Sequence, residues 1–71
     1  MAFNTTKFIT FKNPTGWLIS PAVANIVAVA RHPFEELTSV TMVNGDEYFT
    51  DELPEQILEK ISQVELHDQQ R

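Results

Sequence analysis

An Asn44-Gly45 pair between two runs of alternating apolar and polar residues is the feature that most restricts the fold of this chain. Asn-Gly is the preferred two-residue turn of a β-hairpin, because a type I′ turn needs positive φ at both of its central residues. The flanking runs, residues 39–43 and 46–50, are rich in β-branched and aromatic residues. They therefore predict two antiparallel strands joined by a tight turn.

The predicted turn also fixes which residues face each other. With a two-residue loop, Val40 lies opposite Phe49, and Thr41 lies opposite Tyr48. Because side chains alternate along a strand, Val40, Met42 and Phe49 then share the core face. Tyr48 is expected on the other face of the hairpin.

An amphipathic helix is predicted directly after the hairpin. Asp51 is the expected N-cap, and Pro54 lies in the first turn, where its missing N–H costs no hydrogen bond. Five apolar residues recur at helical spacing and form the expected buried stripe: Leu53, Ile57, Leu58, Ile61 and Val64.

The first half of the chain predicts further strands. Residues 7–12 and 17–19 read as a second hairpin around the turn at residues 13–16, with Ile9 and Phe11 in the core. Residues 21–24 are expected to form a short helical turn. Residues 26–30 are apolar on both faces and are expected to form a central strand.

Together these elements predict an α+β fold with a small antiparallel sheet of four to five strands and one C-terminal amphipathic helix. Residues 1–66 are expected to form a single domain, and residues 67–71, which have no apolar side chain, a frayed tail. The chain has 71 residues and no cysteine, so packing rather than disulfides must stabilise the fold.

Charge divides the chain into two unlike parts. Residues 1–34 carry three cations and no carboxylate, whereas residues 35–71 carry all ten carboxylates and two cations, giving a net charge of −5. A surface of this sign repels phosphate and attracts basic partners. The composition therefore predicts a binding module with an acidic face, and the candidate acidic contacts are Glu35, Glu36, Asp46 and Glu47.

No arrangement of residues predicts catalysis, a metal or a cofactor. The adjacent carboxylate pairs lie beside expected loops and strand ends rather than in a pocket. His32 and His67 are far apart in the sequence and do not match a metal-ligand spacing. We therefore expect no enzyme, no cofactor and no small-molecule substrate.

Exposed aromatic residues are the other candidate contacts. Phe8, Trp17 and Tyr48 are placed on strand faces that one helix leaves uncovered, and Phe34 lies in the loop before Glu35. Buried aromatic anchors often carry much of the binding energy of a protein interface. Trp17, Phe34 and Tyr48 are therefore predicted to bind the partner.

Membrane and nucleic-acid binding are not expected. The chain has no uninterrupted apolar run near the length of a membrane span and no signal peptide pattern, so a cytoplasmic protein is predicted. Lys7 and Lys12 flank an aromatic strand, but two lysines among ten carboxylates predict no direct nucleic-acid contact.

The hairpin and helix, residues 38–49 and 53–61, resemble the small flagellar and swarming regulators of the FlbD type. Those proteins also run an Asn-Gly hairpin into an acidic helix, here ending in Glu59-Lys60-Ile61. The resemblance covers about half of the chain and implies a bacterial fold relative. One alternative function is therefore an FlbD-like DNA-binding regulator.

The whole chain, with its opening residues 1–8 and its acidic, cysteine-free composition, resembles small phage-encoded inhibitors of bacterial RNA polymerase of the Xanthomonas phage type. This resemblance implies a non-enzymatic protein of the host cytoplasm. It would bind near the N-terminus of the polymerase β′ subunit, displace σ and promote antitermination. A further alternative is an acidic DNA mimic, which needs its carboxylates in a row spaced like phosphates.

Overall fold

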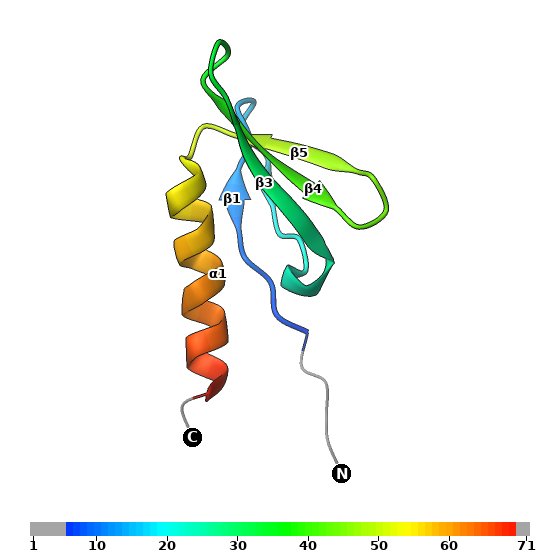
Figure 1. Cartoon of the computed structure of the whole chain (residues 1–71), viewed down its shortest axis with the longest axis vertical. Coiled ribbons are helices and arrows are strands. Elements are labelled where there is room, and N and C mark those ends of the chain that lie inside the picture. The colour runs from blue at the N-terminus through cyan, green and yellow to red at the C-terminus, as the bar shows by residue number, and fades with distance from the viewer. Residues whose placement is uncertain (1–5, 70–71) are drawn as a thin grey trace.

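The computed structural model describes the backbone of residues 6–69 and the side chains of residues 6–65. Five strands, one short 3-10 helix and one α-helix follow each other along the chain (Figure 1). Their bounds are β1 Phe11–Lys12, β2 Leu18–Ile19, η1 Val23–Asn25, β3 Ile26–His32, β4 Leu37–Met42, β5 Glu47–Thr50 and α1 Pro54–Gln69. The predicted α+β class with a C-terminal helix is confirmed.

The described strands form two antiparallel sheets rather than the predicted single sheet. β1 pairs with β2, and the other sheet has the order β3-β4-β5. The two sheets are joined by a side chain: the Thr50 hydroxyl donates to the Lys12 carbonyl oxygen over 2.9 Å. The division follows from the shortness of β1 and β2, which have two residues each.

The first hairpin is closed by one side chain. Asn13 Oδ1 accepts hydrogen bonds from the backbone N–H groups of Thr15 and Trp17, at 3.1 and 2.8 Å. Gly16 has a φ of 100°, a conformation that side chains disfavour. The predicted turn at residues 13–16 is confirmed.

The second hairpin has a longer loop than its sequence predicts. Met42 N donates to Asp46 O over 2.8 Å, and Gly45 N donates to Met42 O over 2.9 Å, so residues 43–45 form the loop. Only Gly45 has positive φ there, at 97°. This is a three-residue loop with glycine in the left-handed position, not a type I′ turn.

The extra loop residue shifts the register of β5 by one. Val40 pairs with Tyr48, and Ser39 pairs with Phe49. Since a one-residue shift exchanges the two faces of a strand, Tyr48 packs against the core and Phe49 lies on the opposite face against His32. The prediction of Phe49 in the core and Tyr48 outside it was wrong.

The expected strand at residues 26–30 is present in β3, but it is an edge strand of its sheet and β4 is the central one. Helix α1 packs on β3, and Figure 1 shows the helix on one side of the sheets. Helix packing accounts for Ile26 and Val29, which pack against the core, whereas Val27, Ala28 and Ala30 of the same run are exposed. The predicted helical turn is confirmed as η1.

The core lies between the two sheets and the helix. Its buried apolar side chains are Ile9, Phe11, Val40, Met42 and Ile57. Ile61 and Val64 of α1 pack against this cluster, whereas Leu53 and Leu58, which were predicted to be buried with them, are exposed. Leu58 lies about 100° from Ile57 around the helix axis, which places it outside the buried stripe.

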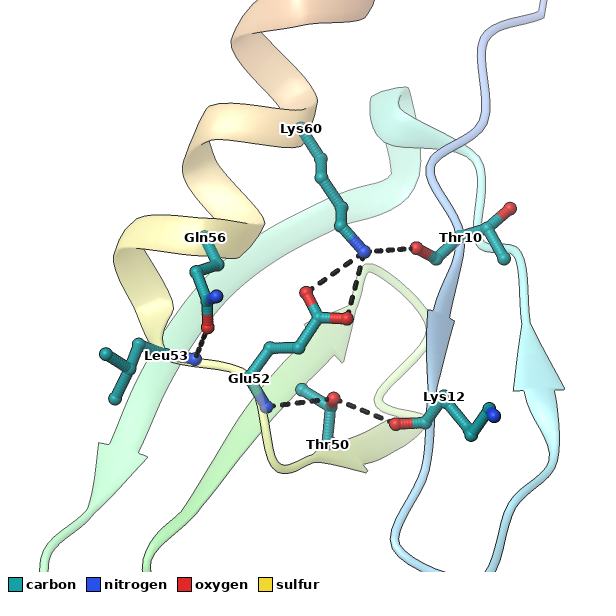
Figure 2. A network of polar contacts seen from close by, with 7 residues as sticks. All are labelled: Thr10, Lys12, Thr50, Glu52, Leu53, Gln56 and Lys60. Carbon is teal, nitrogen blue, oxygen red and sulfur yellow. Dashed lines mark hydrogen bonds and ion pairs between the residues drawn. The ribbon is translucent and has the colours of Figure 1, made fainter.

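The start of α1 differs from the prediction. Leu53, not Asp51, is the N-cap: its carbonyl oxygen accepts from Gln56 N and Ile57 N. Gln56 Oε1 accepts from Leu53 N over 2.7 Å, which is the glutamine half of a capping box (Figure 2). Pro54 occupies the first helical position, which suits its fixed φ and missing N–H.

The C-terminal end of α1 reaches Gln69, so the helix includes the first three residues of the predicted tail. Residues 70 and 71 lie outside the described part of the chain.

Candidate protein interaction surface

The loop between β3 and β4 carries three of the predicted contact residues at its most exposed point. Phe34 is 98% exposed, and Glu35 and Glu36 are exposed beside it. The loop is closed by Glu36 N, which donates to His32 O over 3.0 Å. Glu36 has a φ of 56°, a conformation that costs a non-glycine residue about 1 kcal/mol or more. A large apolar ring and two carboxylates are thus presented together to solvent.

Trp17 is presented at the same end of the molecule. Its side chain is 72% exposed and follows the turn at residues 13–16. Figure 1 shows this turn and the β3–β4 loop at the same end of the sheets. We call Trp17, Phe34, Glu35 and Glu36 the turn-end surface.

A shallow groove of about 320 Å³ lies below the turn-end surface. Its walls come from the β1–β2 hairpin and from strands β4 and β5 of the second sheet. They include Asn13, Ile19, Leu37, Tyr48 and Phe49. The groove shows that the first turn and the start of β4 lie side by side. Glu47 also lines the groove, at its far end: it pairs with Thr41, next to the loop-closing pair of Met42 and Asp46.

Three predicted contact residues do not join this surface. Asp46 pairs with Met42 and Glu47 pairs with Thr41, near the opposite end of β4 from Glu36. β4 has six residues and spans about 17 Å, so Asp46 and the turn-end surface are separate patches. Tyr48 is half-buried: it packs against the core and lines the groove below the turn-end surface. The expectation that Tyr48 is an exposed anchor was wrong, because the register differs by one residue.

The carboxylates at this surface are not neutralised by the protein. Within residues 6–65, Lys60 and Glu52 form an ion pair, with Lys60 Nζ 3.0 Å from Glu52 Oε1. Glu35 and Glu36 have no cation within ion-pair distance in that part of the chain. They therefore remain able to attract a cationic group of a partner.

Leu18 is an exposed apolar residue of this surface that the sequence pattern was not used to predict. Leu18 is exposed beside Trp17, whereas the next residue, Ile19, packs against the core. The alternation of side chains along a strand could have found it, since Ile19 facing inward requires Leu18 to face outward. Leu18 extends the apolar part of the turn-end surface.

In the part of the chain that the structure describes, no three histidine, cysteine, aspartate or glutamate side chains gather where they could hold a metal ion. His32 Nε2 is buried without a hydrogen-bond partner, and the ring tilts against Phe49 with centroids 5.9 Å apart. The side chain of His67 lies outside the described residues.

No protein-family model, curated protein sequence or solved structure matches this chain. None of the described helices is both long and apolar enough to cross a membrane.

Proposed function

We propose that this protein is a non-enzymatic transcription regulator that binds host bacterial RNA polymerase. The proposal takes its partner from the resemblance to phage-encoded polymerase inhibitors, and its contact region from the turn-end surface. The observation that carries it is the combination of unpaired carboxylates with the nearly fully exposed Phe34. A monomeric protein gains nothing in its own fold from exposing such a ring, whereas an interface uses it as an anchor.

The two kinds of side chain have different roles in this proposal. Glu35 and Glu36 attract a basic surface and speed the encounter, because charge complementarity acts chiefly on the association rate. Phe34 and Trp17 fill apolar hollows of the partner and slow dissociation, because buried aromatic anchors supply most of the contact energy. Neither role requires a catalytic group or a cofactor.

The regulatory effect would come from occlusion. A compact domain bound near the N-terminus of β′ would cover polymerase surface that σ uses, and initiation would fail. If it remains bound during elongation, it would also favour antitermination. The protein would act in the host cytoplasm, where the polymerase is located.

Two other functions have less support. A DNA mimic needs carboxylates in one row, but Glu35 and Asp46 lie at opposite ends of β4. An FlbD-like DNA binder needs a basic face, yet Lys60 is paired with Glu52 and Arg31 donates to Thr38. The described residues thus offer few cations for phosphate.

Binding to purified bacterial RNA polymerase tests the proposal. The full chain is immobilised and exposed to core polymerase, to holoenzyme, to the isolated β′ N-terminal region and to a random DNA duplex. We expect submicromolar binding of core polymerase and of the β′ region, weaker binding of holoenzyme, and no binding of the duplex at physiological salt. Binding of the duplex with no binding of polymerase would instead support a DNA-binding regulator.

A further inference from the structure

A second hollow, separate from the turn-end surface, lies where the β4–β5 loop meets the segment before β3. It has a volume of about 320 Å³. The side chains that matter for its chemistry are Pro21, Asn25, Met42, Asn44, Asp46 and Tyr48. We call this hollow the Asp46 pocket.

The carboxylate of Asp46 is held in a fixed position by the loop. Asn44 Oδ1 accepts from Asp46 N over 3.0 Å, and Asn44 Nδ2 donates to Asp46 Oδ2 over 3.2 Å. Asp46 O accepts from Met42 N, so the residue is fixed at both its backbone and its side chain. Within the described residues, Oδ1 accepts no hydrogen bond and no cation lies within ion-pair distance. The pocket thus offers an oriented, unneutralised carboxylate.

The rest of the pocket is suited to an aliphatic chain. Pro21 and Met42 are buried side chains that line it, so part of its wall is apolar. Asn25 and Tyr48 also line it and contribute polar atoms of their own. A carboxylate beside an apolar wall fits a ligand with a hydrocarbon stem and a cationic head.

Between the two natural side chains of this kind, the pocket favours arginine over lysine. A guanidinium is planar and can donate to both oxygens of one carboxylate, whereas an ammonium acts as a point charge that holds its water more strongly. The volume lies near the lower limit of ligand sites, which suits one side chain rather than a larger ligand.

We propose that the Asp46 pocket receives an arginine side chain of the protein partner. The inference rests on the proposed function, because it assigns a second contact to the same basic partner. β4 separates this pocket from the turn-end surface by about 17 Å. A round interface of about 800 Å² per partner is about 30 Å across, so one partner can reach both sites.

Nα-acetyl-arginine amide, used as a probe with the uniformly ¹⁵N-labelled full chain, tests the pocket without polymerase. We expect saturable shifts of the amide signals of Asn25, Asn44, Gly45 and Asp46, with a dissociation constant in the millimolar range. The neutral analogue Nα-acetyl-citrulline amide should shift them at least about fivefold less, and the lysine analogue should bind more weakly than arginine. Equal shifts with the citrulline and arginine probes would overturn the inference.

Two variants of equal charge separate the pocket from general attraction. Asp46→Asn removes the carboxylate and keeps its shape, and Glu47→Gln removes the same charge at the next exposed position. Asp46→Asn should weaken arginine binding by about tenfold or more, and Glu47→Gln by less than about twofold. Equal losses in the two variants would show that the net charge, not the pocket, attracts the probe.

Polymerase binding by the same variants distinguishes failure of the inference from failure of the proposed function. If wild type binds polymerase and Asp46→Asn weakens binding more than Glu47→Gln does, the inference holds. If both variants bind polymerase alike, the inference fails and the proposed function stands. Binding of the arginine probe by a protein that does not bind polymerase would overturn the proposed function and, with it, the assignment of the arginine to that partner.

Discussion

Lys60 Nζ lies 3.0 Å from the Glu52 carboxylate and donates to the Thr10 carbonyl oxygen over 2.6 Å (Figure 2). The ammonium therefore joins helix α1 both to the loop before it and to the segment before β1. Both side chains are about two-thirds buried, at 35% and 29% exposed. This places a long-range polar contact between the first and last thirds of the chain.

Removing the ammonium should destabilise the fold. Lys60→Met keeps most of the apolar stem but loses both contacts, and we expect a decrease of about 1–2 kcal/mol in the free energy of unfolding. Glu52→Gln leaves the Thr10 contact in place and should cost less. Urea unfolding of the two variants measures this, with the exposed Glu59→Gln as the control. A Lys60→Met variant as stable as wild type would show that the contact contributes nothing in solution.

Replacing Glu36 by glycine should stabilise the fold. Its φ of 56° disfavours any side chain, so Glu36→Gly should raise the free energy of unfolding by about 0.5–1 kcal/mol. Glu35 has no positive φ, so Glu35→Gly should lower stability instead, although it removes the same charge. The melting temperatures of Glu36→Gly and Glu35→Gly, measured by thermal unfolding, are compared with that of the wild type. Equal changes in both would contradict the loop geometry.

Gly45 should resist substitution by a branched residue. At a φ of 97°, valine is strained even though a Cβ would meet no neighbouring atom within 4 Å. We expect Gly45→Val to lower the melting temperature by about 8 °C or more, for a cost of about 2 kcal/mol in a domain of this size. Val43→Ala in the same loop is exposed and should change it by less than about 2 °C.

Truncation to alanine should reduce stability at Tyr48 but hardly change it at Trp17. Tyr48 packs against the core, so Tyr48→Ala should cost about 2–4 kcal/mol of stability. Trp17 is exposed, so Trp17→Ala should change stability by less than about 0.5 kcal/mol. Guanidinium unfolding followed by circular dichroism tests both. A stable Tyr48→Ala variant would indicate that the register expected from a two-residue loop was correct after all.

The hairpin marks the limit of what its sequence could predict. Asn44-Gly45 correctly placed the loop, because the glycine does adopt positive φ. The dipeptide could not distinguish a two-residue type I′ turn from a three-residue loop ending in glycine, since both place glycine in that position. That single residue decided whether Tyr48 or Phe49 faced the core.

The other differences also depend on packing at long range. Helical spacing correctly predicted that Ile57, Ile61 and Val64 face the core, but it wrongly included Leu53 and Leu58, which are exposed. It could not show that β3 lies at the edge of its sheet, because an apolar strand beside a helix has the same composition as a central one. Exposure of Phe34 followed from its place in a loop, whereas its position near Trp17 required the arrangement of two hairpins.

The central claim is that the turn-end surface binds bacterial RNA polymerase, and the kinetics of binding test it most directly. Association and dissociation rates of immobilised polymerase are measured for Phe34→Ala, for the double variant Glu35→Lys with Glu36→Lys, and for the exposed control Leu58→Ala.

We predict that Phe34→Ala raises the dissociation rate by about tenfold or more, and that the charge reversal slows association in a way that depends on salt. Leu58→Ala should bind as wild type. Folded Phe34→Ala and charge-reversed variants that bind polymerase with wild-type rates at low salt would contradict the claim.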